Sequence, residues 1–143
     1  THGIRNPDHA ETRVSQMPAF DGVLSPAEIS AVVAHVRTIS GQRKGDALSQ
    51  QGAALFATNC AVCHGPEGKG GRAVGAPNLT DGIWLHGYGE QAIMNMVNNG
   101  KVNQMPAQEG RLTPSQIHVL TAYVWGLSNK PVVAAAPAAP AKN

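Results

Sequence analysis

Aromatic residues are scarce in this sequence of 143 residues, where Phe, Trp and Tyr together make up only 4%. A chain of this length with 42% hydrophobic residues can bury one compact core of ordinary size. Few aromatic side chains are available to fill that core. We therefore expect either a core of small aliphatic residues or a large, flat, apolar cofactor that supplies the missing bulk.

A strong charge of either sign is also missing, because the formal net charge is only +2. That excess is too small to indicate binding to nucleic acid or to an anionic membrane surface. No apolar run approaches the roughly 20 residues that span a bilayer, and no signal peptide opens the chain. Because the sequence does not begin with Met, we expect a processed or shortened chain.

The two cysteines both lie in one motif, Cys60-Ala61-Val62-Cys63-His64. They are too close in sequence for an ordinary structural disulfide, and the motif is instead typical of c-type haem attachment. Two thiols at this spacing can form thioethers with the two vinyl groups on one edge of the porphyrin. His64 then lies under the iron as its proximal ligand. A redox dithiol or half of a zinc site would need a βαβ pattern or a second Cys or His pair, and the sequence has neither.

One pattern occurs twice without a gap, as QMPAFDGVLSPAEISAVVAHVRTIS from residue 16 and as QMPAQEGRLTPSQIHVLTAYVWGLS from residue 104. Such internal similarity indicates a duplication. Each copy joins a Met-Pro loop to an amphipathic helix with apolar residues three and four positions apart. The predicted capping residues and first helical prolines are Ser25, Pro26 and Glu28 in one copy and Thr113, Pro114 and Gln116 in the other.

The rest of the chain predicts further helices and no strands. We expect helices from Asp46 to about Thr58 and from Glu90 to Asn98, with a Gly-rich loop between them. An alternating strand pattern is missing, so the predicted fold class is all-α. Residues 42–46 are interpreted as a linker, and residues 130–143 as a disordered tail rich in Ala and Pro.

A low-spin electron carrier needs a sixth iron ligand, and a thioether in that position favours the ferrous state. Met105 is the local candidate, because it follows the haem motif in a Pro-anchored loop before the last helix. Met17 has the same place in the first copy of the repeat. Met94 and Met96 lie inside a predicted helix, where packing in the core explains them better.

Over residues 46–128 the sequence resembles class I cytochrome c. The resemblance rests on Gly52 and Phe56 before CAVCHG, Pro77, Met105-Pro106 and a final helix with Tyr123. It implies haem-wrapping helices in which the Gly-x-x-x-aromatic face of the first helix crosses the last helix. Phe56 and Tyr123 are then both expected to be buried. It also implies that the carbonyl of Pro77 accepts a hydrogen bond from the second ring nitrogen of His64.

Two longer stretches, HGIR with ETRVSQMPAF and GAALFATNC through DGIWL, are similar to the dihaem subunit III, or subunit P, of cbb3-type cytochrome c oxidases. That subunit has a membrane anchor followed by two cytochrome c domains. The resemblance implies that residues 1–41 are the C-terminal half of an upstream domain without its haem motif. Residues 46–129 are then a cytochrome c domain with one covalent haem. Trp84 borders the haem or a propionate, with plain core packing as the alternative.

The two domains of this family are thought to exchange their Met loops. The resemblance therefore favours Met17 as the partner of His64, whereas the sequence alone favours Met105, and both stay candidates. By the same resemblance, the missing anchor would tether the chain to the periplasmic side of the bacterial inner membrane.

The function implied is one-electron transfer in aerobic respiration, from a donor c-type cytochrome to other subunits of a membrane oxidase. No catalysis is expected at this domain itself. A haem peroxidase is an alternative that would want a distal acid-base His or Arg, which the Met-Pro loops do not supply. A haem gas sensor is another, and it would want an output domain.

Overall fold

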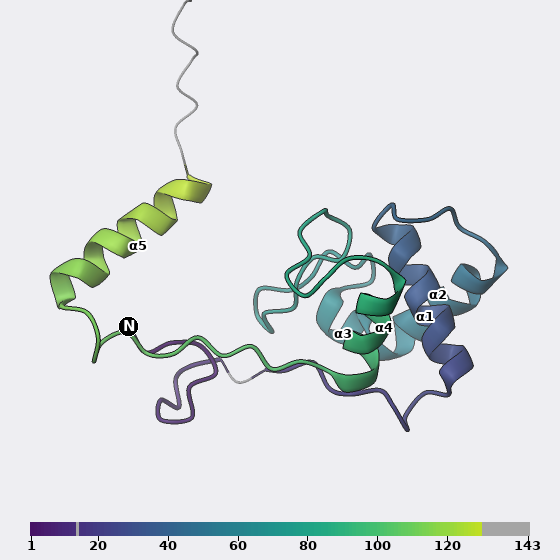
Figure 1. The fold of residues 1–143 in the computed structure, drawn as a ribbon, viewed down its shortest axis with the longest axis horizontal. Coiled ribbons are helices and arrows are strands. Elements are labelled where there is room, and N and C mark those ends of the chain that lie inside the picture. The colour runs from purple at the N-terminus through teal and green to yellow at the C-terminus, as the bar shows by residue number, and fades with distance from the viewer. Residues whose placement is uncertain (14, 130–143) are drawn as a thin grey trace, which may run out of the picture.

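The computed structural model describes residues 1–13 and 15–129, so the predicted tail over residues 130–143 lies outside the described residues. The helices follow in the order α1 (Pro26–Ile39), α2 (Ala47–Asn59), α3 (Ala61–His64), α4 (Glu90–Asn99) and α5 (Pro114–Ser128) (Figure 1). Pairing of extended backbone in the described residues is limited to four isolated bridges. The predicted all-α class is confirmed.

The two repeated helices begin as their sequences predict. The hydroxyl of Ser25 accepts a hydrogen bond from the amide of Glu28, whose carboxylate accepts one from the amide of Ser25 at 2.8 Å. Thr113 and Gln116 make the same reciprocal pair at α5. Because each box satisfies amide groups that the first turn leaves without partners, both helix starts are fixed locally.

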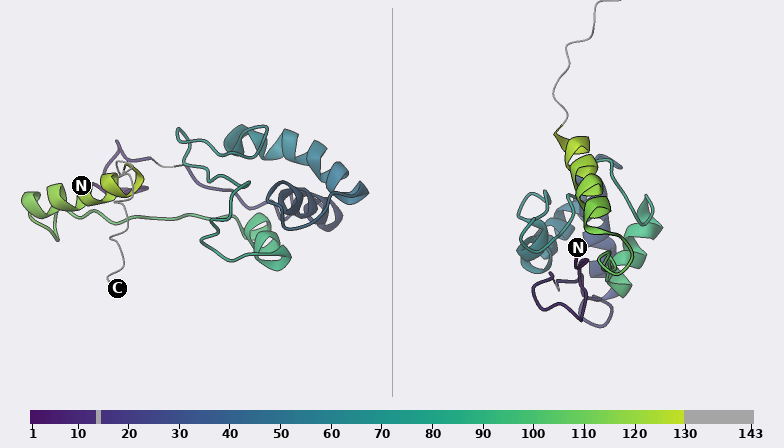
Figure 2. Two further views of the ribbon diagram at one scale, coloured as in Figure 1. Left: turned by 90° about the horizontal axis from the view of Figure 1, so that it is seen from above. Right: turned by 90° about the vertical axis from the view of Figure 1, so that its left-hand side faces the viewer.

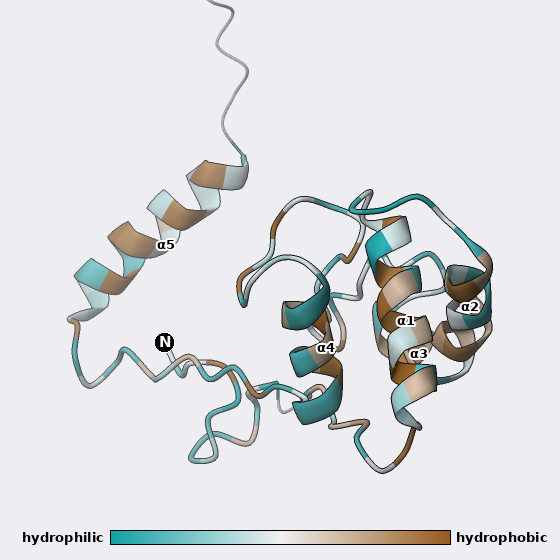
Figure 3. Cartoon of the chain, turned by 45° about the vertical axis from the view of Figure 1, so that its right-hand side comes forward, coloured by the Kyte–Doolittle hydropathy of each residue, from teal (hydrophilic) through white to brown (hydrophobic). Residues whose placement is uncertain are grey.

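The core is aliphatic and lies between α1, α2 and α4. Its buried members are Leu24, Ile29, Val32, Val33, Val36, Phe56, Ile93 and Val97. One aromatic residue among eight agrees with the low aromatic content of the sequence. Figure 3 shows hydrophobic colour along the middle turns of α1, which packs against α2 and α4. The two described copies of the repeat thus differ sharply, because α1 is in the core and α5 has no buried residue.

The helices α1 and α2 cross at Gly52. A Cβ atom added there would overlap the carbonyl group of Ala31 and would lie 2.9 Å from the Cβ of His35. One turn further along α2, the ring of Phe56 packs on the ring of His35, with centroids 5.2 Å apart. His35 is the repeat counterpart of Tyr123. In this structure α1 therefore occupies the place that the resemblance gives to the last helix.

The prediction that Tyr123 is buried is wrong, because its side chain is 65% exposed. Within the described part of the chain, α5 packs against no other helix, and the view from above shows it apart from them (Figure 2, left). The surface of α2 around Gly52 is already covered by α1, which has the same apolar spacing. The connection from α1 to α2 is only residues 40–46, so closing that contact costs little chain entropy.

The segment before α1 runs antiparallel to the segment before α5. Met17 and Lys101 exchange two backbone hydrogen bonds of 3.1 and 2.9 Å, and Ile4 and Met105 exchange two of 2.9 and 3.1 Å. This pairing connects α5 to the helical core. Among the described residues, no helix has the length and apolarity required to cross a membrane.

The crossing at Gly52 gives a matched pair of substitutions. Gly52→Ala inserts a methyl group between two helix backbones, and we expect it to lower the free energy of unfolding by roughly 1–3 kcal/mol. Gly126→Ala in α5 is the control, because an added Cβ there meets nothing within 4 Å. That change should leave stability unchanged or raise it by up to about 1 kcal/mol through helix propensity. Equal losses in urea unfolding of the two haem-loaded variants would contradict the crossing.

The burial of His35 against Phe56 predicts that the stability of the fold depends on pH. Burial holds the pKa of His35 below its ordinary value, against a smaller opposite effect of the Ser49 backbone. The unfolded chain then binds more protons as the pH falls through about 6.5, so stability is lost in that direction. His35→Tyr installs the residue of the second copy and should remove this part of the loss. Urea unfolding between pH 8 and pH 5 would show parallel curves for the two proteins if His35 has no such role.

Candidate haem-binding site

The haem-attachment motif continues directly from α2 into the single turn of α3, which the sequence analysis did not predict. The amide of Cys60 donates to the carbonyl of Phe56 at 2.9 Å, and the amide of His64 donates to the carbonyl of Cys60 at 2.9 Å. Cys60 and Cys63 are therefore one helical turn apart, a spacing that puts two side chains on the same side of a helix. The turn presents two thiols and the adjacent imidazole together.

His64 is buried, with 8% of its surface exposed, and one of its nitrogens has a partner. Its Nδ1 lies 3.1 Å from the carbonyl oxygen of Pro77, so the contact expected from the resemblance is present. A neutral imidazole that donates from Nδ1 keeps a lone pair at Nε2, as a metal ligand requires. Burial lowers the pKa of His64, with the Pro77 carbonyl opposing, and so favours this neutral form.

The Gly-rich loop allows Pro77 to approach His64. Gly70 has a φ of +80°, and an added Cβ would lie 2.6 Å from the oxygen of Ala76 and 2.7 Å from the carbonyl carbon of Pro77. The amide of Gly70 also donates to the carbonyl of His64 at 2.7 Å. A side chain at this position would push the Pro77 carbonyl away from the imidazole, so glycine is required there.

A cavity of about 440 Å³ opens beside the motif. Residues of α1, α2, α3 and α4 contribute to its wall, together with the segments that surround Met17, Pro77 and Trp84. Its apolar and sulfur-bearing lining includes Met17, Phe20, Val32, Val36, Phe56, Cys60, Cys63, Pro77, Leu79, Trp84, Ile93 and Val97. The size and the mainly apolar wall are typical of a cofactor site.

The burial of the thiols argues against the alternative function of a redox dithiol. Burial, with a further contribution from the neighbouring Cys63, raises the pKa of Cys60 to about 11. At neutral pH its thiol is therefore protonated, whereas a reactive dithiol needs a stabilised thiolate. The site favours covalent attachment over thiol redox chemistry.

The two candidate methionines lie in different surroundings. Met17 lines the cavity that also contains His64. Met105 is not one of the described residues around this cavity, and half of its surface is exposed. The loop of Met17 is fastened to the rest of the site, because the hydroxyl of Ser15 donates to the carbonyl of Val74 and the side chain of Arg5 donates to the carbonyl of Ser15.

Trp84 lines the same cavity. Its ring nitrogen donates to the carbonyl of Asp81 at 3.1 Å, and its ring meets that of Tyr88 edge to face at 6.2 Å. These contacts fix the indole on the loop between α3 and α4, where it forms part of the cavity wall.

A glycine of positive φ supports each Met-Pro loop. At Gly100, with φ +65°, an added Cβ would lie 2.6 Å from the carbonyl carbon of Pro18. At Gly3, with φ +81°, it would lie 2.9 Å from the carbonyl carbon of Pro106. The two loops are thus held in the same way, each by backbone from the other half of the chain.

The matching roles of Gly3 and Gly100 are not visible in the sequence, because their spacing to the next methionine differs between the copies. From Gly3 to Met17 there are 14 positions, whereas from Gly100 to Met105 there are five. The contribution of α1 to the cavity wall was not predicted either. The sequence did hold a sign of this contribution. The two repeated helices have apolar residues at the same spacing, so either helix could cover α2.

The sequence matches the family described as cytochrome c oxidase, cbb3-type, subunit III, over residues 47–124. A cytochrome c domain implies covalently bound haem c, and the pair Cys60 and Cys63 fits its attachment motif. The buried imidazole with a fixed tautomer and the apolar cavity beside the thiols also fit that group.

Named relatives agree with this match. The chain is 49% identical over 129 residues to the cbb3-type cytochrome c oxidase subunit CcoP of Cereibacter sphaeroides, covering 89% of this chain and 44% of the relative. It is 47% identical over 125 residues to subunit FixP of Azorhizobium caulinodans, covering 87% and 42%. The chain thus spans less than half the length of these relatives. With the fold, the attachment motif and the matched residues in agreement, the chain belongs to the family of cbb3-type cytochrome c oxidase subunit III.

Proposed function

We propose that this chain carries one covalent haem c and transfers single electrons as part of a cbb3-type cytochrome c oxidase. Electrons would arrive from a donor c-type cytochrome and continue towards the catalytic subunit in aerobic respiration. The observation that carries the proposal is that a tautomer-fixed His64, two thiols and a methionine meet at one apolar cavity. The names of the relatives, which are subunits of this oxidase, support the assignment of the complex.

Each residue has a distinct part in this proposal. Cys60 and Cys63 would hold the haem through thioethers, and His64 would be the proximal ligand, oriented by Pro77. Haem c supplies a one-electron change at its iron, with a potential set by the axial ligands and by burial. Val32, Val36 and the other apolar wall residues would exclude water from the site.

We assign the sixth ligand to Met17. Its support is that Met17 lines the cavity of His64 while Met105 is half exposed and paired with Ile4. The thioether would then come from the segment before α1, and the working domain would combine residues 15–41 with residues 46–100.

Met105 and α5 would correspondingly serve a second cytochrome c domain. This assignment is supported by the two glycines that lie against the loops, Gly100 against the loop of Met17 and Gly3 against the loop of Met105. Leu120 and Val124 of α5, which match the core residues Val32 and Val36 of α1, are exposed. Residues 1–41 would then be part of an upstream domain by their position in the chain, but they would supply a ligand to the haem held by Cys60, Cys63 and His64.

We place the chain on the periplasmic side of the bacterial inner membrane. Covalent haem attachment is normally completed there, and the relatives are named as subunits of an oxidase of this class. Any tether to the membrane would come from the part of the relatives that this chain does not span.

A peroxidase or gas-sensing role is less well supported by the cavity. Arg5 and His86 do line it. However, the guanidinium of Arg5 donates to the carbonyls of Ser15 and Asn103, and His86 pairs with the amide of Asn103 at 3.0 Å. Neither is held as a free distal acid or base, and a tight Met17 ligand would leave no open position for peroxide or gas.

Absorption spectra of the purified protein test the function and the ligand together. We expect a c-type spectrum with the far-red band of methionine on ferric iron, a reversible one-electron titration and no rapid binding of carbon monoxide. Met17→Ala should abolish the far-red band, whereas Met105→Ala should leave it at full intensity. Loss of the band in Met105→Ala alone would contradict the exchange, and complete carbon monoxide binding by the unmutated protein would contradict an electron carrier.

The glycines behind the two loops give a test that leaves both methionines in place. Gly100→Ala should displace the Met17 loop, because its Cβ would lie within 2.7 Å of Pro18 and Ala19 backbone atoms. Gly3→Ala should displace the Met105 loop in the same way. We expect the far-red band to weaken by at least half in Gly100→Ala and to persist in Gly3→Ala. The opposite pattern would assign the ligand to Met105.

A further inference from the structure

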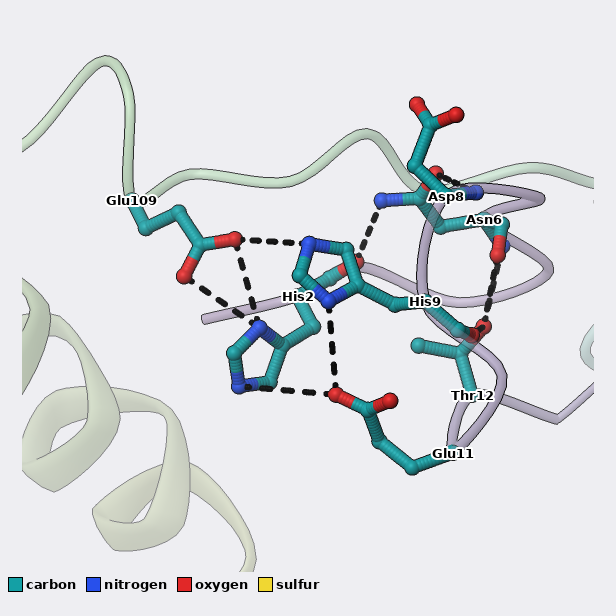
Figure 4. Close-up of polar contacts among 7 residues, drawn as sticks. All are labelled: His2, Asn6, Asp8, His9, Glu11, Thr12 and Glu109. Carbon is teal, nitrogen blue, oxygen red and sulfur yellow. Dashed lines mark hydrogen bonds and ion pairs between the residues drawn. The ribbon is translucent and has the colours of Figure 1, made fainter.

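Two histidines and two glutamates gather where the segment before α1 meets the segment before α5 (Figure 4). His2 and His9 lie with ring centroids 4.4 Å apart. Glu11 comes from the same loop, and Glu109 comes from the segment that leads into α5. The loop between Gly3 and Met17 is the one that is longer in the first copy, and it brings His9 and Glu11 to this position.

The carboxylates lie on opposite sides of the two rings (Figure 4). Glu109 is 3.2 Å from Nδ1 of His2 and 2.9 Å from Nε2 of His9. Glu11 is 3.8 Å from Nε2 of His2 and 3.3 Å from Nδ1 of His9. Each imidazole therefore has one nitrogen towards Glu109 and the other towards Glu11.

The proton count of this cluster points to a cation. A neutral imidazole has one N–H and one lone pair, and an ionised carboxylate only accepts hydrogen bonds. If each ring carries its proton on the nitrogen that faces Glu11, at 3.3 Å for His9 and 3.8 Å for His2, then two nitrogen lone pairs face the oxygens of Glu109. That arrangement is repulsive unless two further protons or one divalent cation lie between them. A divalent ion carries the same charge as those two protons and binds all three groups at once.

We propose that Nδ1 of His2, Nε2 of His9 and the carboxylate of Glu109 form a binding site for Zn²⁺, with Glu11 accepting the remaining N–H of His9. The ligand atoms of the three residues all lie within 4.8 Å of one another. Tetrahedral zinc with bonds of about 2.0–2.2 Å needs its ligand atoms roughly 3.3–3.6 Å apart, so small side-chain movements suffice. A carboxylate that accepts the second N–H of a ligating imidazole, as Glu11 would for His9, is the usual support of such a site.

The loop that carries the histidines is held independently of any ion. The side-chain amide of the buried Asn6 donates to the carbonyl of His2 at 2.9 Å. Thr12 donates to the carbonyl of His9 at 2.9 Å. The amide of Gln108 donates to the carbonyl of Thr1 at 2.8 Å, next to Glu109. The ligands are thus placed in advance, and their partial exposure leaves a path from solvent.

Calorimetric titration of the haem-loaded protein with zinc chloride tests the site. We expect one zinc ion per chain and an unchanged haem spectrum, since none of the three ligands lines the haem cavity. His9→Gln and Glu109→Gln should each weaken binding at least about tenfold, and Glu11→Gln by about 10- to 100-fold, the usual cost of losing such a supporting group. His118→Gln, an exposed histidine on α5, is the control and should bind as the unmutated protein does.

Two results would overturn the proposal. One is no zinc binding to the unmutated protein. The other is loss of zinc binding in His2→Gln together with full binding in Glu109→Gln. That pattern would indicate that zinc binds to the amino group of Thr1 and to His2 alone. Far-ultraviolet circular dichroism of every variant distinguishes a lost ligand from a lost fold. If the chain does not bind haem c, the c-type absorption spectrum will be missing, and the zinc titration can still be interpreted.

Discussion

The close contact of α1 with α2 at Gly52 determines how the rest of the molecule is arranged. Glycine allows the two helix backbones to approach so closely that no side chain fits between them. Phe56 then packs on His35, and Val32 and Val36 are brought to the cavity that contains His64. Once α1 has this place, α5 has no position left on the same surface. The exposed apolar face of α5 is therefore a consequence of the contact at Gly52.

Most features that depend on neighbouring residues could be predicted from the sequence, and the single turn of α3 is the exception. The capping boxes at Ser25 and Thr113, the helix that starts at Glu90 and the thiol-imidazole motif are all encoded within a few positions. The burial of Tyr123 was predicted wrongly because it depends on which of two similar helices covers α2. Apolar spacing is the same in both, and only the three-dimensional competition between α1 and α5 distinguishes them.

The residue types of the haem site could be predicted from the sequence, but the segment that supplies its methionine could not. Cys60, Cys63 and His64 come from one short motif, so their proximity follows from the sequence, whereas the contact of Pro77 with His64 was implied by the resemblance. The choice between Met17 and Met105 stayed open because the repeat gives both loops the same residues. The backing of those loops by Gly100 and Gly3 was hidden by an unequal spacing, which a search for a constant repeat offset cannot detect.

The order of the elements along the chain also has a consequence for folding. In this arrangement α1 precedes α2 and is joined to it by residues 40–46, so their packing is a contact of short sequence separation. Such contacts form fast, because little loop entropy is lost. A chain that emerges with its amino end first would present the helical hairpin as soon as α2 is complete. The part of the cavity wall that α1 and α2 supply would then be in place when Cys63 and His64 appear.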